Sequence, residues 1–182
     1  MSTPTINIPG YITGTWTIDP IHSDVSFIVR HLGVSKVRGQ FNTFAGEIVT
    51  AENPLESTVN ATIDAGSFHT RQEQRDAHVR GEEFLHTDEH PEVKFTSTAI
   101  RQDGEEFLLD GDLSIRGVTK PVTLALEING FGQGPDGSPV VGISATTDIN
   151  RKDFGVHGGA AGVMVSEKIQ IALEIEAGLK KD

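Results

Sequence analysis

The chain has 182 residues, with 26 acidic against 15 basic side chains and a formal net charge of −11. This length suits one domain that buries a core or encloses a cavity, and the acidic balance argues against a nucleic-acid-binding protein, which needs a net basic face. Cysteine is absent, which excludes a disulfide framework, a thiolate nucleophile and a cysteine zinc site.

The first residues, MSTPTINIPGYITGTW, contain no basic region and no apolar run of the length of a signal peptide. No later segment approaches the roughly 20 apolar residues that span a bilayer. We therefore expect a cytoplasmic protein without a transmembrane segment, and transient contact with a membrane stays open. Residues 1–13 are expected to form an N-terminal extension of a single domain over 1–182.

From residue 24 onwards, apolar and polar residues alternate with a period of two in most of the chain. Half-buried antiparallel strands produce this pattern. Gly/Pro-rich or Gly/Asp-rich turn signals separate several of these segments, such as QDG at 102–104 and GQGPDGSP at 132–139. The predicted strands are 24–32, 57–64, 92–100, 107–115, 121–128, 141–149 and 168–177.

The first predicted hairpin, FIVRHLGVSKVRGQF at 27–41, gathers positive and titratable side chains at its tip. These are Arg30, His31, Lys36 and Arg38. Its turn, GVSKV at 33–37, is echoed by GVTKPV at 117–122, because both carry Gly, Val, a hydroxyl residue and Lys. Chance similarity of turn chemistry accounts for the echo as well as an internal relationship does.

One segment, 67–91, breaks the alternation. Thr70 and Glu73 have the spacing of a capping box, and Gly81 suits the residue that follows a helix. We predict a helix of about ten residues between them, within a helical excursion over about 70–85.

About eight strands and one helical connection predict an all-β fold, an extended antiparallel β-barrel, because closure removes exposed strand edges. An open sandwich is the alternative. Alternation places one apolar face of each strand inside the barrel, and small residues (Ala61, Ala99, Gly111 and Ala145) are interspersed. The pattern favours a packed core and a ligand tunnel equally. The predicted inward residues are Val25, Phe27, Val29, Val59, Ala61, Ile63, Phe95, Phe107, Leu109, Leu113 and Ile143.

Strict alternation of strand direction places successive loops at opposite ends of the barrel. One end then holds the loops at 33–36, 65–91, 116–120 and 150–162, and ten of the 15 Lys and Arg residues lie at or beside it. Acidic residues in the excursion offset its arginines as ordinary ion pairs. The side chains that form a candidate ligand-facing rim, as against a solvated surface, are His31, Arg38, Arg116 and Arg151.

Catalytic and metal motifs are weak. His69, His78, His86 and His90 invite a metal-dependent hydrolase as an alternative function, but Pro91 disfavours helix at His90, so His86 and His90 need not share a face. Surface or capping histidines are the preferred interpretation. The chain has no Gly-x-Ser-x-Gly elbow, and HGGAAGVMV at 157–165 lacks the frame of a phosphate loop. We therefore expect no catalytic residue, metal or cofactor.

Five separated motifs stand in order along the chain: WTIDPIHSDVSFIVRHLGVSKVRGQF, FHTRQEQRDAHVRGEEFL, HPEVKFTS, GDLSIRGVTKPVTL and INRKDFG. On these motifs the chain, from about Gly14 to Ala177, resembles the YceI-like family of bacterial polyisoprenoid-binding proteins with a lipocalin-like barrel. The resemblance implies an apolar tunnel for a long isoprenoid or fatty-acyl chain, and no catalysis. Many relatives carry a signal peptide and work in the periplasm or outside the cell, whereas this sequence shows none.

These observations predict a non-enzymatic protein that binds, stores or transports a long-chain amphiphilic lipid. The lipid tail would lie in the tunnel, and His31, Arg38, Arg116 and Arg151 would hold a phosphate or carboxylate head group through charge-assisted hydrogen bonds. A stress-associated interaction protein with a filled core is a third alternative. Only the base rate of symmetric oligomers favours a homodimer.

Overall fold

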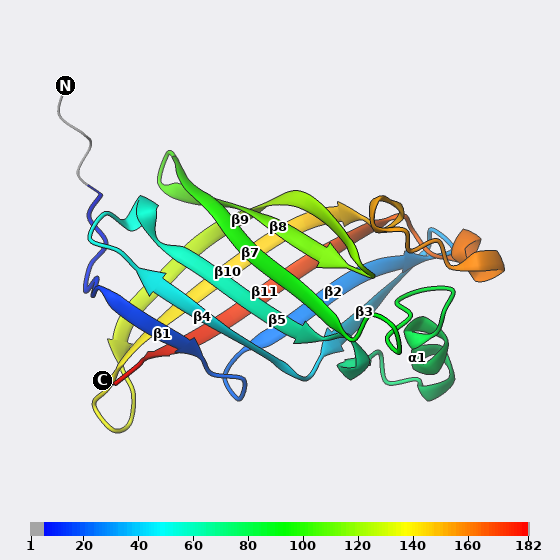
Figure 1. The fold of residues 1–182 in the computed structure, drawn as a ribbon, viewed down its shortest axis with the longest axis horizontal. Helices are drawn as coiled ribbons and strands as arrows, with labels where there is room; N and C mark the ends of the chain where they lie inside the picture. The colour runs from blue at the N-terminus through cyan, green and yellow to red at the C-terminus, as the bar shows by residue number, and fades with distance from the viewer. Residues whose placement is uncertain (1–5, 182) are drawn as a thin grey trace.

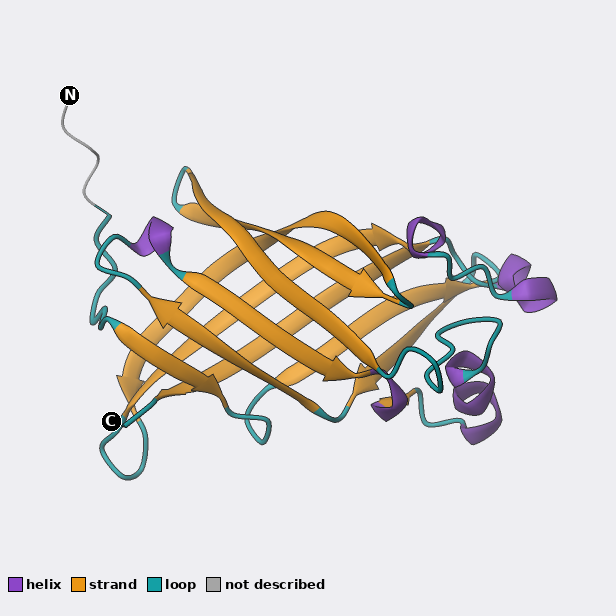
Figure 2. Cartoon of the chain, viewed as in Figure 1, coloured by secondary structure: helices purple, strands orange, loops and turns teal. Residues whose placement is uncertain are grey.

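Eight antiparallel strand positions close into a barrel in the computed structural model, which describes residues 6–181 (Figures 1 and 2). The strands are β1 (Gly14–Ile18), β2 (Asp24–His31), β3 (Ser35–Phe41), β4 (Phe44–Thr50), β5 (Thr58–Asp64), β6 (Phe68–His69), β7 (Glu92–Asp103), β8 (Glu106–Ile115), β9 (Val118–Gln133), β10 (Pro139–Asn150) and β11 (Lys168–Leu179). One α-helix, α1 (Glu73–Arg80), and four short 3₁₀ helices complete the described chain: η1 (Pro54–Glu56), η2 (Ala65–Ser67), η3 (Arg151–Phe154) and η4 (Gly159–Met164).

Three of the eight strand positions are interrupted. β1 and β2 pair one after the other with β11, through Ile18–Ala177 and Val25–Leu173, so they form one broken strand. β4 and β3 pair with β1 and β2 in the same way, and β5 and β6 pair with β4 and β3. The pairing of β1 with both β4 and β11 closes the barrel, which confirms the predicted closed architecture.

The predicted alternation holds along the strands except where a β-bulge interrupts the β7–β8 or β9–β10 pairing. In β7 the register shifts between Ser97 and Ala99, so Thr98 is the extra residue. A bulge puts two residues opposite one, which moves every later side chain to the other face. Ala99 is therefore exposed, and the next residue, Ile100, lines the interior instead. The prediction that Ala99 points inward is wrong for this reason.

The predicted helix exists but begins differently. α1 starts at Glu73, and its N-cap is Gln72, whose side chain accepts a hydrogen bond from the Arg75 amide. Thr70 does not cap the helix; its hydroxyl and amide both donate to the carboxylate of Asp76, at 2.5 and 2.8 Å. Gly81 follows the helix with a φ of −78°, so it is not the left-handed stop that the sequence predicted.

The buried side chains form three clusters along the barrel. Trp16 packs edge-on against Phe131 near the end that carries the termini, and its indole donates to Thr50. Phe84 and Phe154 pack at the opposite end, beside the helical excursion. A smaller cluster around Leu109, Leu124 and Ala145 lies between them.

The loops divide between the two ends as the alternation predicted (Figure 1). The β2–β3 turn, the α1 excursion, the β8–β9 turn and the segment between β10 and β11 share one end, here called the helix end. The β7–β8 turn, the β9–β10 loop and the loop containing η1 lie at the other. None of the helices within residues 6–181 has the length and apolar composition of a membrane-spanning segment.

A candidate lipid cavity inside the barrel

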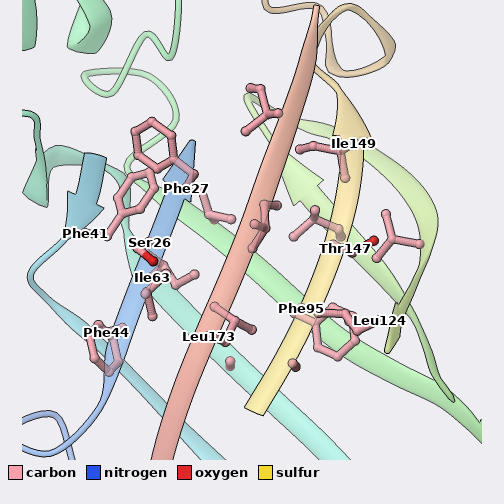
Figure 3. Close-up of a pocket in the computed structure, with 18 of the residues that line it drawn as sticks. Ser26, Phe27, Phe41, Phe44, Ile63, Phe95, Leu124, Thr147, Ile149 and Leu173 are labelled. Carbon is pink, nitrogen blue, oxygen red and sulfur yellow. The ribbon is translucent and has the colours of Figure 1, made fainter. Parts of the chain in front are cut away.

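A cavity of about 500 Å³ occupies the inside of the barrel (Figure 3). Its wall extends from Tyr11 and Pro54, near the termini, to His78, Ala161 and Met164 at the helix end. The volume is within the range of small-molecule sites, and a cavity that follows the barrel suits an extended ligand better than a compact one. The sequence favoured a packed core and a ligand tunnel equally. The structure contains both, because the three buried clusters border the cavity.

All eleven side chains predicted to face inward lie on this wall. Their placement follows from the period of two in the strands, which turns every second side chain to the interior. Their contact with a ligand stays a prediction. The sequence argument missed several wall residues that follow the same alternation: Leu124, Leu126 and Ile128 on β9, Ile149 on β10, and Ile169, Ile171, Leu173 and Ile175 on β11.

The small residues of the wall do not all leave space. Ala61 and Ala145 line the cavity, as the sequence predicted. Gly111 instead lies under the ring of Phe95, so closely that a Cβ atom there would be 2.3 Å from the Phe95 Cζ atom. Gly39 lies under Phe27 in the same way, at 2.1 Å. At these two positions glycine makes room for an aromatic ring of the wall.

An aromatic group borders the cavity toward the helix end. Phe27 and Phe68 stack with ring centroids 5.3 Å apart, and Phe41 lies 5.7 Å from Phe68 and 5.8 Å from Phe27. Figure 3 shows Phe27 and Phe41 side by side beyond Ser26. Because aromatic rings have few rotamers, this group gives that part of the cavity a defined shape.

The few polar atoms in the wall already have protein partners. The Ser26 hydroxyl donates to the Ala172 carbonyl at 3.1 Å, and the Thr147 hydroxyl donates to the Thr123 carbonyl at 2.8 Å. A buried polar group without a partner would favour a ligand with a complementary polar atom. Since these groups are satisfied, the middle of the cavity presents an apolar surface to whatever occupies it.

Arg151 does not have the geometry of the predicted head-group ligand. It lines the cavity but is only 3% exposed. Its five guanidinium N–H groups donate to five backbone carbonyls, those of Val156, His157, Gly162, Val165 and Ser166. A guanidinium has five donors, so none is left for a head group. The side chain instead holds the loop between β10 and β11.

Arg116 and Arg38 do not join a common rim either. The Arg116 Nη1 atom donates to the carbonyls of Glu82 and Phe84, which fixes the turn after α1. Arg38 is exposed and points away from the main cavity, beside a second hollow of about 220 Å³ that it shares with His69 and Arg71. The geometry therefore does not support the predicted four-residue rim.

His31 lines the cavity and is also exposed, so the interior reaches the surface at this residue. Arg75 and His78, on α1, share both properties, although the sequence did not place them in the rim. The Arg75 side chain donates to the Thr70 hydroxyl at 2.7 Å, and the His78 Nε2 atom lies 2.7 Å from a Glu83 oxygen. We call His31, Arg75 and His78 the polar mouth. The sequence placed His31 at this end but not Arg75 and His78, because a long loop decides where α1 lies.

The four histidines of the alternative hydrolase do not converge. His69 lies against Asn42, and His78 against Glu83. His86 and His90 do come together, with Glu89, so that their ligand atoms lie within 4.8 Å of one another. The same description fits Asp19, His22 and Glu176, an exposed group of ion pairs in which the Asp19 hydrogen bond raises the pKa of His22.

The most strongly lowered carboxyl pKa belongs to a side chain outside the cavity. Hydrogen bonds from Arg101 and Thr123 lower the pKa of Asp110 to about 2. Asp110 follows the inward-facing Leu109 and so lies on the outer face of β8. A carboxyl group with a perturbed pKa in a cleft indicates acid–base chemistry. Asp110 lies outside the cavity, and its lowered pKa reflects its ion pair with Arg101.

Comparisons with known proteins agree with the fold and identify the family. The model of the YceI-like domain matches residues 16–177. The UPF0312 protein plu2095 of Photorhabdus laumondii is 41% identical over 134 residues, which cover 73% of this chain and 70% of that protein.

Two solved structures share the fold. That of the Campylobacter jejuni YCEI protein has a TM-score of 0.74 and 30% identity, and the match covers 84% of this chain and 90% of that one. A domain from Saccharophagus degradans, described as polyisoprenoid-binding and implicated in plant cell wall breakdown, has a TM-score of 0.73. It is 14% identical, and the match covers 93% of this chain and 100% of that domain. On its own residues and on the family match, this chain belongs to the YceI-like family.

Proposed function

We propose that this protein binds a long-chain amphiphilic lipid, of the polyisoprenoid or fatty-acyl type, and carries or stores it without catalysis. The observation that carries the proposal is the apolar cavity of about 500 Å³ that follows the barrel interior of a YceI-like domain. The polyisoprenoid-binding description of the Saccharophagus domain, which shares the fold, supports the same class of ligand.

The energetics favour a tail over a compact metabolite. Each buried methylene contributes roughly 0.8 kcal/mol against water, so a few isoprene or acyl units suffice for tight binding from solution. A bilayer offers the tail a similar environment, and transfer from a bilayer is therefore nearly neutral for the tail. Selectivity must then come from the shape of the cavity and from the head group.

The head group is proposed to lie at the polar mouth. His31, Arg75 and His78 border the cavity and contact water, so a phosphate or carboxylate there would stay partly solvated while its tail is buried. Cationic donors bind such anions through short charge-assisted hydrogen bonds. Arg151 is left out of this site because backbone carbonyls occupy all five of its donors. Arg116 is left out because it does not line the cavity and its Nη1 atom binds carbonyls of the turn after α1.

The test is the lipid content of the purified full-length protein. We expect organic extraction and mass spectrometry to recover a long-chain lipid, and the delipidated protein to bind added palmitate or a polyprenyl phosphate. A protein that carries no lipid and binds neither probe would contradict the proposal.

A metal-dependent hydrolase is the second candidate, and one observation favours it: the grouping of His86, Glu89 and His90. A catalytic zinc site uses about three such ligands and an open position. Metal analysis of the purified protein separates the two functions, because stoichiometric zinc, iron or manganese that is lost in H86A/H90A would favour the hydrolase. An interaction protein with a filled core is disfavoured by the cavity.

A further inference from the structure

Exposed apolar side chains gather at one place on the surface of this protein. Among the described residues, seven large hydrophobic side chains are exposed, and four of them lie at the helix end of the barrel. These are Leu32 at 61%, Val34 at 80%, Val163 at 89% and Met164 at 41%. We call these four residues the apolar tip.

The apolar tip is one surface built from two segments. Leu32 and Val34 lie in the β2–β3 turn, while Val163 and Met164 belong to η4. The Leu32 amide donates to the Met164 carbonyl at 2.8 Å, and the Ser166 amide donates to the Arg30 carbonyl at 2.9 Å. These backbone bonds hold the two segments together, so the four side chains are presented as a group.

The charge around the tip differs from that of the whole chain. Residues 27–41 and 154–166 contain no Asp or Glu, although the chain has 26 acidic residues and a net charge of −11. Arg30, Lys36 and Arg38 are all exposed on β2 and β3. Of the acids beside these segments, Glu83 lies against His78 and Glu167 against Lys152, while Asp153 is exposed. An apolar group flanked by free-standing cations is complementary to a bilayer surface with anionic head groups.

The cavity opens at the same place. Met164 belongs to the tip and also lines the cavity, and the neighbouring His31 is exposed and lines it too. A surface that met a bilayer through the tip would therefore bring the cavity opening to the lipid.

The backbone conformation at position 32 does not explain why the residue there is a leucine. Leu32 has a φ of +55° and precedes Gly33 at +71° in the turn. Asn or Asp is favoured at such a position, and leucine is unfavourable. The corresponding residue of the β8–β9 turn is Arg116, with a φ of +52°, whose side chain binds two carbonyls. Leu32 is largely exposed, so packing within the barrel does not offset its backbone strain.

We propose that the apolar tip is a docking surface for a lipid bilayer that contains anionic lipids, with Arg30 and Lys36 binding the head groups. This inference deepens the proposed function and rests on it for its purpose, because docking would place the cavity opening against the membrane from which a lipid is taken or to which it is delivered. The docking itself is measurable without reference to the content of the cavity.

The experiment is co-sedimentation of the full-length protein with vesicles of phosphatidylcholine, with and without phosphatidylglycerol. We expect binding to the anionic vesicles and a loss of at least about tenfold in V34D/V163D. The matched control is I21D, since Ile21 is 86% exposed but lies in the loop between β1 and β2. Binding by I21D should stay within about twofold of the original protein.

Two further variants separate the contributions. L32N should weaken vesicle binding while its unfolding midpoint stays equal or rises, because Asn suits the left-handed turn position; misfolding then cannot explain the loss. R30E/K36E should lower affinity about tenfold or more for anionic vesicles and little for pure phosphatidylcholine, since each cation near an anionic surface contributes separately.

Three outcomes would overturn the inference: no binding of the original protein to either vesicle, equal binding by V34D/V163D, or a dimer that V34D/V163D converts to a monomer. The last would make the tip an interface between copies. Lipid recovered by extraction, together with no vesicle binding, rejects docking and leaves the proposed function intact. Vesicle binding without any extractable lipid or probe binding rejects the proposed function instead.

Discussion

At the scale of single residues, the guanidinium of Arg151 is the strongest constraint on the loop that follows β10. It is 3% exposed, and five carbonyl groups between Val156 and Ser166 accept its hydrogen bonds. Carbonyl dipoles here take the place of water around a buried charge. The loop they belong to carries part of the apolar tip and part of the cavity wall, so one side chain organises both.

Substitution of Arg151 should therefore be costly for stability. In R151M, five carbonyls lose their donor, and the two of them in buried contacts, those of Val156 and Gly162, cost about 1–3 kcal/mol each when unsatisfied. We expect the free energy of unfolding, measured in urea, to fall by about 3 kcal/mol or more. R151K should recover only part of this lost free energy of unfolding, because an ammonium has three donors in a different geometry. R38A, at an exposed site, should change stability by less than about 0.5 kcal/mol, and an equal effect of R38A and R151M would contradict this account.

The Asp110 ion pair predicts a dependence of stability on acid. Hydrogen bonds from Arg101 and Thr123 lower the pKa of Asp110 to about 2 from its ordinary value of 3.8. A carboxyl group with a lowered folded pKa stabilises the protein above its unfolded pKa and loses that contribution as the pH falls through the folded value. D110N should therefore be less stable than the original protein at pH 7, and the difference should shrink between about pH 4 and pH 2.

Urea unfolding at pH 7, 4, 3 and 2 measures this difference. The matched control is D112N, which changes an exposed carboxylate two residues along the same face of β8. A difference between D110N and the original protein that stays constant down to pH 2 would show that the ion pair is not its source.

At the scale of the strand, glycine and phenylalanine act as cross-strand pairs in the cavity wall. Gly39 pairs directly with Phe27 across β2 and β3, and Gly111 lies under Phe95 between β7 and β8. The ring covers the glycine backbone, so the strand loses no burial where it lacks a side chain. These pairs fix the rotamers of Phe27 and Phe95, and with them the width of the cavity.

A methyl group at either glycine should displace the ring. A Cβ atom at position 39 would lie 2.1 Å from Phe27 Cζ, so we expect G39A to lower the free energy of unfolding by about 1–3 kcal/mol, as overpacking does. G178A is the in-strand control, because nothing lies within 4 Å of its added Cβ, and the loss of chain entropy in the unfolded state should leave it neutral or more stable. Chemical denaturation of both variants checks this, and equal stabilities would contradict the pairing.

At the scale of the whole molecule, the sheet closes into a barrel without its interior being completely filled. The pairings of β1 with β4 and β11 remove the sheet edges there, while the buried clusters around Trp16 and Phe154 occupy the two ends. Between and beside them a cavity of about 500 Å³ is left. A ligand that binds only the folded barrel should stabilise it by mass action.

Filling the cavity should abolish that stabilisation. Ala145 is 5% exposed and borders the cavity, so the ring of A145F would occupy part of the ligand space. At a probe concentration of 100 times Kd, binding contributes about 2.7 kcal/mol, which raises Tm by roughly 5–10 °C for a chain of this size. We expect this rise with palmitate or a polyprenyl phosphate in the original protein and in A99F, where the ring points outward. An equal rise in A145F would place the ligand elsewhere.

The strands and their inward faces were predictable from the sequence, because the pleat of a strand turns every second side chain the same way whatever its partner. This local rule placed Phe27, Leu109 and Ile143 on the cavity wall. It failed at Ala99, because the bulge at Thr98 depends on how β7 pairs with β8. The echo between the turns at Gly33 and Gly117 is also local: in both, two successive residues have positive φ, as in type I′ turns.

The interior and its mouth depend on contacts between distant segments, which composition and spacing do not encode. Arg151 and Arg116 read as rim charges in the sequence, but chain folding brings carbonyls of later and earlier loops to their donors. Arg75 and His78 reach the mouth only because the excursion returns over the end of the barrel. The sequence by itself determined the antiparallel strands and the apolar face of each. The tertiary structure decided that the sheet closes, that a cavity remains inside and which polar groups surround its mouth, because strand pairing, volume and hydrogen-bond partners are properties of the packed whole.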